Sequence, residues 1–109
     1  MDGFIAAADH PECVQLRQLQ PFTTLLVWTQ NSFYRFVVVD HPSVWVQGGA
    51  HFADPTPAQL EGASMGLGFV LDGWICIGLK IELRAVGTRI VTSPVLAICT
   101  EAAGDSVAH

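Results

Sequence analysis

Charged side chains are scarce in this sequence, and long apolar runs are missing. Only 14% of the 109 residues are charged, against about 25% in ordinary globular domains. Five bases are too few and too scattered to form the basic footprint that nucleic acids or anionic membranes require. The longest apolar run, residues 65–79, is interrupted by Asp72 and several glycines and is shorter than the ~20 residues of a membrane span. These absences predict that the partner is neither a nucleic acid nor a membrane.

The sequence also lacks paired cysteine motifs. Cys13, Cys76 and Cys99 show no C-x-x-C spacing, and their number is odd. The first residues contain neither the basic start nor the apolar segment of a secretory signal. Together these features predict reduced thiols and a cytoplasmic location.

The formal net charge of −5 comes from the two ends of the chain. Residues 17–100 contain five acids and five bases, so the body is neutral, and half of all residues are apolar. A neutral, apolar body has little electrostatic repulsion to keep two copies apart. The sequence therefore predicts a homo-oligomer.

Runs rich in Val, Ile, Phe, Trp and Thr predict an all-β fold. The expected strands cover residues 22–30, 33–40, 43–47, 74–84, 88–92 and 95–100. Asn31-Ser32 is expected to form a two-residue hairpin turn, which places Trp28 opposite Arg35. That pair could form a cation–π contact, or the ring could pack under the arginine stem.

One segment carries the signals of a helix start. Thr56-Pro57-Ala58-Gln59 has a capping threonine, a proline at the first helical position and a glutamine three residues after the cap. Gly62 is expected to end this helix after one or two turns. The predicted fold is a small antiparallel β-barrel of about six strands with one short helix. It forms a single domain over residues 11–100, with loose ends at 1–10 and 101–109.

Gly62-Ala63-Ser64-Met65-Gly66 matches the G-x-S-x-G pattern of hydrolase nucleophiles. That chemistry needs a strand before the serine and a long helix after it. The residues before Ser64 are expected to be helical, and the glycines after it cannot sustain a helix. Ser64 is therefore interpreted as a loop residue near one end of the barrel, and no catalytic residue is predicted.

Four polar residues are weak candidates for a ligand site. His51 and Asp54 are close in sequence, and His41 could join them if strand 43–47 folds back. Zinc needs three or four ligands in a defined geometry, and this loose trio favours solvated turn residues instead. Asp72 lies in the most apolar run, where a carboxylate could act as a general acid or base, but Asp72-Gly73 is also a common turn. No metal and no cofactor are predicted.

The aromatic residues are accompanied by too few bases for a nucleic-acid stacking platform. They could line a small ligand cavity or an interface between proteins, and the neutral composition favours the interface. Its candidate residues are Trp28, Arg35, Trp45 and Trp74.

Three blocks of the sequence, TQNSFYRF, GGAHF with PTPAQLEGASMG, and GWICIGLKIEL with RIVTSPV, resemble a small bacterial β-barrel domain that has no assigned activity. The resemblance implies a barrel fold and an origin in the bacterial cytoplasm. It implies no functional residues.

The leading functional expectation is a non-enzymatic, self-associating interaction or assembly module. The alternative is a small-ligand barrel or minor enzyme whose site lies near Gly48–Asp54 and Asp72. A nucleic-acid-binding small barrel is disfavoured by the low positive charge.

Overall fold

The computed structural model describes residues 11–66 and 68–101. Loose ends are predicted at 1–10 and 101–109; residues 1–10 and 102–109 lie outside the described residues, and Glu101 belongs to the last strand. The described chain is all-β, with ten strands and one short 3-10 helix, η2 (Leu16–Gln18). The all-β prediction is therefore confirmed, and the number of strands is larger than the predicted six.

Eight strands form one antiparallel sheet, and two short strands form a second. The large sheet runs in the order β10-β2-β3-β4-β5-β8-β9, and β6 pairs with β5 beside this path. The bounds in the large sheet are β2 (Thr24–Thr29), β3 (Phe33–Asp40), β4 (Ser43–Gly48), β5 (Phe52–Gly66), β6 (Phe69–Asp72), β8 (Lys80–Ala85), β9 (Thr88–Val91) and β10 (Val95–Glu101). The small sheet pairs β1 (Cys13–Gln15) with β7 (Trp74–Cys76).

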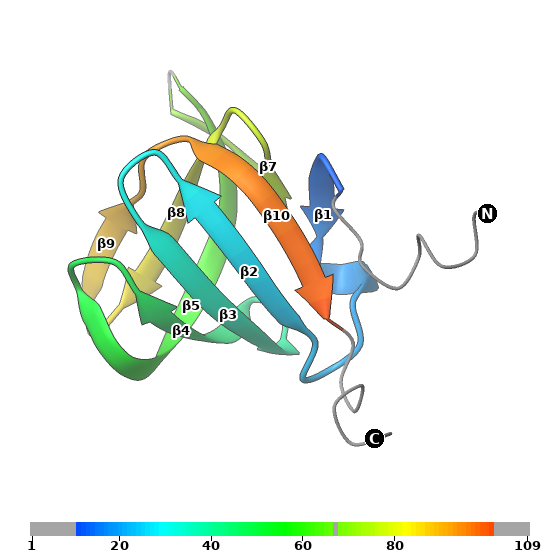
Figure 1. Ribbon diagram of the computed structural model, residues 1–109, viewed down its shortest axis with the longest axis vertical. Helices are drawn as coiled ribbons and strands as arrows, with labels where there is room; N and C mark the ends of the chain where they lie inside the picture. Colours follow the sequence, from blue (N-terminus) through cyan, green and yellow to red (C-terminus); the bar gives the residue numbers. More distant parts are fainter. Residues whose placement is uncertain (1–10, 67, 102–109) are drawn as a thin grey trace.

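The large sheet folds over on itself at β5. The first half of this strand pairs with β4, and its second half pairs with both β8 and β6. In Figure 1, β10, β2 and β3 consequently form a front layer, and β5, β8 and β9 lie behind them. The core between the layers contains Leu25, Val27 and Phe36 from the front and Leu60, Ile81 and Leu83 from the back.

The predicted closed barrel is not found. β9 and β10, the strands at the two ends of the sheet order, do not pair in the described part of the chain. Only the start of β10 is joined to the rear of the molecule, where Val95 exchanges backbone hydrogen bonds with Gly78 and Leu79. The sheet is rolled but open.

The predicted helix over residues 56–61 is wrong, since this segment lies within β5. Ala58 and Leu60 are buried while Pro57 and Gln59 are exposed, which is the two-residue period of a strand. Pro57 pairs with β4 and precedes Gln59, where the pairing of β5 with β8 begins. Because Pro57 has no N–H, it fits this position, where β8 does not pair with β5. Tertiary pairing thus overrides the local capping signal.

The strand predicted over residues 74–84 is also interrupted. Residues 77–79 form a turn between β7 and β8, in which Leu79 N–H donates to Cys76 O at 3.1 Å. Gly78 allows this turn because its φ of 91° lies in the left-handed region. In the sequence, apolar residues continue to alternate through residues 77–79, so the periodicity does not reveal that the strand is interrupted there.

Candidate functional site

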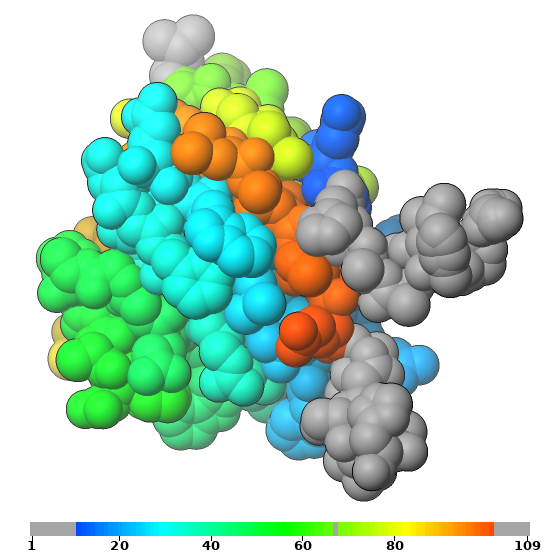
Figure 2. Space-filling model, in the orientation of Figure 1, coloured from blue at the N-terminus to red at the C-terminus, as the bar shows by residue number. Residues whose placement is uncertain are grey.

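The outer face of the front layer carries two rows of apolar side chains, and Arg35 and Gln47 lie between them on β3 and β4. Inward-facing residues of β2, β3 and β4 are buried in the core, and the alternate residues point outward. The outward group, called the aromatic face below, consists of Leu26, Trp28, Phe33, Arg35, Val37, Trp45, Gln47, Pro57, Ala97 and Cys99. Figure 2 views the molecule onto β10, β2 and β3, whose side chains lie side by side there.

Strand pairing places the apolar members of the aromatic face side by side within each row. Ala97, Trp28 and Phe33 are consecutive partners across β10, β2 and β3. The rings of Trp28 and Phe33 have centroids 5.0 Å apart, a distance typical of favourable aromatic pairs. In a second row, Val37 pairs with Trp45, which pairs with Pro57. Trp28, Phe33 and Trp45 still expose 39%, 42% and 43% of their surfaces.

The predicted opposition of Trp28 and Arg35 is wrong, because the turn is centred on Gln30-Asn31 rather than on Asn31-Ser32. Trp28 pairs with Phe33, and Arg35 pairs with Leu26. The register has slipped by two residues, which leaves every side chain on the face expected for it. Arg35 therefore still lies on the aromatic face, and no ion pair within the described chain involves it.

Trp74, the fourth predicted interface residue, lies elsewhere. It belongs to β7, where it pairs with Gln15 of β1 in the small sheet. The structure therefore places Trp28, Arg35 and Trp45 on one face and separates Trp74 from them.

A hollow of about 520 Å³ lies directly beside Trp45. Its walls combine apolar and polar residues: Val39, Ser43, Val44, Trp45, Pro57, Ala58, Gln59, Arg84, Ala85, Val86 and Gly87. The aromatic face thus combines projecting rings with an adjoining depression, which is a shape that can interlock with another apolar surface.

His41 and Asp72 are brought together as a second feature of the molecule. Asp72 Oδ2 lies 3.8 Å from His41 Nε2 and accepts a hydrogen bond from the Arg17 guanidinium. Gln15 donates from Nε2 to Asp72 O at 3.3 Å. The neighbouring cavity of about 680 Å³ is lined by Arg17, His41, Pro42, Gln59, Leu60, Glu61, Val70 and Asp72.

The electrostatics of this cluster favour a structural role. The hydrogen bond from Arg17 holds the pKa of the Asp72 carboxyl below its usual value against an opposing effect of desolvation, and the charges of Arg17 and His41 add to the lowering. Asp72 is thus ionised at neutral pH and cannot serve there as a general acid. His41 Nδ1 is buried and has no hydrogen-bond partner in the described part of the chain.

The cluster fastens residues 15–17 to the segment where β6 ends and β7 begins. Arg17 and Gln15 both bond to Asp72, and Leu16 N–H donates to Gly73 O at 2.8 Å. Arg17 was not singled out in the sequence, because nothing near it indicates a partner 55 positions away. These bonds hold residues 15–17 in place. The cluster contains no nucleophilic side chain with a base beside it.

His51 and Asp54 are not part of this cluster. Both are exposed, His51 in the turn after β4 and Asp54 in β5, and the cavity beside Asp72 is lined by none of residues 48–54. No group of three or more histidine, cysteine or carboxylate side chains within residues 11–66 and 68–101 is placed to hold a metal ion. The four polar candidates therefore do not form one site.

Ser64 lies in β5 and not in a loop, which corrects the expectation. Its strand partners are Val70 and Lys80, and its hydroxyl contributes to lowering the pKa of Glu82. A strand does precede Ser64, contrary to the sequence interpretation, but the chain after it turns into another strand, β6. The strand–turn–helix geometry of a hydrolase nucleophile is absent from this described segment.

Cys13 and Cys76 form a disulfide, so the prediction that all the thiols are reduced is wrong. The two residues are direct partners across β1 and β7, with Cα atoms 4.1 Å apart. Cys99 is free. The spacing of 63 residues gives no signal in the sequence, since only the fold brings the two strands together.

No protein-family model matches the chain, and comparisons with curated proteins and with solved structures find no similar protein. The resemblance to a small bacterial β-barrel domain therefore adds no functional residue. Within the described residues, no helix is long and apolar enough to span a bilayer.

Proposed function

We propose that the protein is a non-enzymatic interaction module that associates with a second copy of itself through the aromatic face. The observation that carries this proposal is that Trp28 and Phe33 form a ring pair and that Trp45, on the next strand, points from the same face of the sheet, each about two-fifths exposed. Aromatic side chains are enriched in the cores of protein interfaces, and contiguous exposed apolar patches mark interaction sites.

The charges on this face support a second copy as the partner. Arg35 lies within the aromatic face, and Glu101 lies at its margin opposite Thr24. A twofold axis presents the same surface to itself, so the single cation of one copy can meet the acid of the other. The other residues of the aromatic face are uncharged, and Arg84, which lines the adjoining hollow, already has Glu61 as its ion-pair partner.

The expected cytoplasmic location loses its main support in the Cys13–Cys76 disulfide, because disulfides are rare in reducing compartments. Self-association does not depend on the compartment. The proposal therefore keeps the interaction function and leaves the location open.

A matched pair of variants tests this function. Trp45→Glu places a charge in the proposed interface and is expected to leave a monomer in light scattering, while the wild type has a larger mass. Phe69→Glu is the control, because Phe69 is an even more exposed aromatic residue on β6, away from the aromatic face. Equal masses for the two variants at every concentration would refute the assignment of this face.

A further inference from the structure

The edge of β10 is largely unpaired. β10 pairs with β2 on one side, and on its other side only Val95 has backbone partners, in Gly78 and Leu79. Residues 97–101 have no strand beside this edge in the described part of the chain. An open edge presents N–H and C=O groups that can pair with another extended chain.

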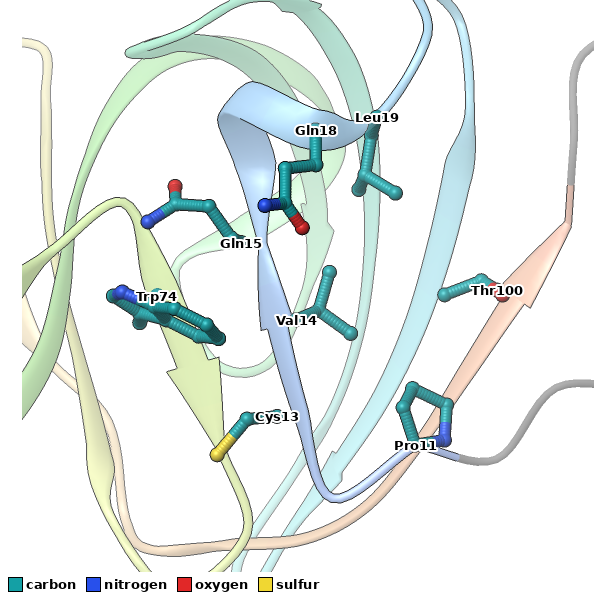
Figure 3. Close-up of a pocket in the computed structure, with 8 residues that line it drawn as sticks. All are labelled: Pro11, Cys13, Val14, Gln15, Gln18, Leu19, Trp74 and Thr100. Atoms are coloured by element: carbon teal, nitrogen blue, oxygen red, sulfur yellow. The ribbon is translucent and has the colours of Figure 1, made fainter.

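A second strand borders the same opening. β1 pairs with β7, and no backbone hydrogen bond between described residues links it to β10. A cavity of about 530 Å³ separates the two strands, with Val14 of β1 and Thr100 of β10 among its walls. Figure 3 shows both side chains pointing into the gap from opposite sides, with Leu19 and Pro11 at its ends.

The walls of this cavity, called the β1–β10 groove, are uncharged. They consist of Pro11, Cys13, Val14, Gln15, Gln18, Leu19, Trp74 and Thr100. Burying a charged side chain against them would be unfavourable, whereas small apolar groups and hydroxyls can be accommodated.

We propose that the β1–β10 groove binds an extended, uncharged peptide segment of a partner protein by adding a strand to β10. A ligand that uses the edge of β10 must carry backbone donors and acceptors along its length, and an extended peptide does so. At about 3.3 Å per residue, the edge formed by residues 97–101 matches a segment of roughly five residues. The groove lies at the sheet edge and the aromatic face on its outer surface, so this inference stands apart from self-association.

The Cys13–Cys76 disulfide contributes to the groove. β1 has only three residues and pairs with β7 alone, and the disulfide joins these two strands covalently. Cys13 also lines the groove. The disulfide therefore fixes the wall that faces β10, and its reduction is expected to weaken peptide binding.

The probe is a fluorescein-labelled, end-blocked peptide that alternates threonine and valine, added to the full chain and followed by fluorescence anisotropy. The control peptide has the same sequence with two alternate backbone nitrogens methylated. Because methylation removes the donors of one peptide edge, we expect it to weaken binding by about tenfold or more.

Two matched substitutions locate the site. Thr100→Arg fills the β1–β10 groove with a charged side chain and is expected to weaken binding of the probe by about tenfold or more. Thr88→Arg alters the other sheet edge, β9, in the same way and is expected to leave binding unchanged. In the wild type, the probe is also expected to slow hydrogen exchange of the amides of residues 97–101, a readout that does not depend on any variant folding.

Three results would overturn the proposal. The first is equal binding of the methylated and unmethylated peptides, which would indicate an apolar cavity without strand pairing. The second is loss of binding in Thr88→Arg with retention in Thr100→Arg, which would assign the peptide to β9. The third is unchanged hydrogen exchange in β10 at saturating probe.

Discussion

At the scale of single residues, Glu82 is a carboxylate with only 5% of its surface exposed. It accepts hydrogen bonds from Arg89 Nη2 at 2.7 Å and Nε at 3.2 Å. These bonds, aided by Ser64, lower the pKa of Glu82 despite its desolvation. The folded state thus favours the ionised carboxyl more strongly than the unfolded state does.

A lowered folded-state pKa makes stability depend on pH. Ionised Glu82 stabilises the folded state at pH values above the pKa of the unfolded chain, for which 4.5 is the reference. This stabilisation is lost as the pH falls through the lower pKa of the folded state. We expect Glu82→Gln to lower the free energy of unfolding at pH 7 by about 1–2 kcal/mol and to flatten its decline below pH 4.5. Urea denaturation at several pH values measures both effects.

Glu61→Gln is the control for this experiment. Glu61 pairs with Arg84, but both side chains are substantially exposed, and such pairs contribute at most about 1 kcal/mol. An equal loss of unfolding free energy in Glu82→Gln and Glu61→Gln would show that burial does not strengthen the ion pair between Glu82 and Arg89.

Gly62 tests the close contact between β5 and β6. Its φ is 148°, and a side chain there would place Cβ only 2.0 Å from the backbone oxygen of Leu71. We expect Gly62→Ala to lower the free energy of unfolding by about 2–4 kcal/mol, because a backbone atom must move. Gly87→Ala provides the comparison, since Gly87 also has a positive φ of 76° but open space around it. If Gly62→Ala lowered the free energy of unfolding no more than Gly87→Ala does, the close approach of Leu71 to Gly62 would be contradicted.

At the scale of elements, the β2–β3 hairpin is closed by a threonine. Thr29 Oγ1 accepts a hydrogen bond from Ser32 N–H at 3.1 Å and donates one to Ser32 O at 3.0 Å. Thr29→Val preserves the shape and removes both bonds, so we expect a loss of about 1–2 kcal/mol in the free energy of unfolding. Thr24→Val is the control in the same strand, because no side-chain hydrogen bond of Thr24 occurs in the described chain. Thermal or urea unfolding that fails to separate the two variants would argue against this role of Thr29.

Sequence periodicity predicts the strands that are long and paired with neighbours along the chain. The strands expected at 33–40, 43–47 and 95–100 agree with β3, β4 and β10 to within a residue. The slip at the Thr29–Ser32 turn moves partners but not faces, so Trp28 and Arg35 share a face of the hairpin as predicted, although they are not opposite each other. The helix expected at 56–61 fails because its capping residues are local, whereas the pairing of β5 with β4 and β8 is not.

At the scale of the whole molecule, three features missed by sequence reasoning join distant segments. The disulfide spans 63 positions, and the bond between Arg17 and Asp72 spans 55. The fold-over of the sheet at β5 likewise decides whether the strands close into a barrel, and alternation of apolar residues does not encode it. By contrast, Trp28 and Arg35 are predicted to share one face, because the two-residue period within a hairpin fixes the side of the sheet on which each residue lies.

The disulfide is expected to stabilise the whole fold. It closes a loop of 63 residues, for which the loss of chain entropy in the unfolded state corresponds to about 4 kcal/mol. We therefore expect the double variant Cys13→Ala with Cys76→Ala to unfold at lower urea concentration, and Cys99→Ser to unfold close to the wild type. A thiol assay on denatured, unreduced protein should detect one free thiol per chain, and three would contradict the Cys13–Cys76 disulfide.

Sedimentation equilibrium of the wild-type chain is the most direct test of self-association through the aromatic face. With rising protein concentration, the mass is expected to increase from the monomer value of 11.7 kDa to at least twice that value. Salt should have little effect on the transition, because the buried face is almost uncharged. A mass that stays at 11.7 kDa across the whole concentration range would contradict the account.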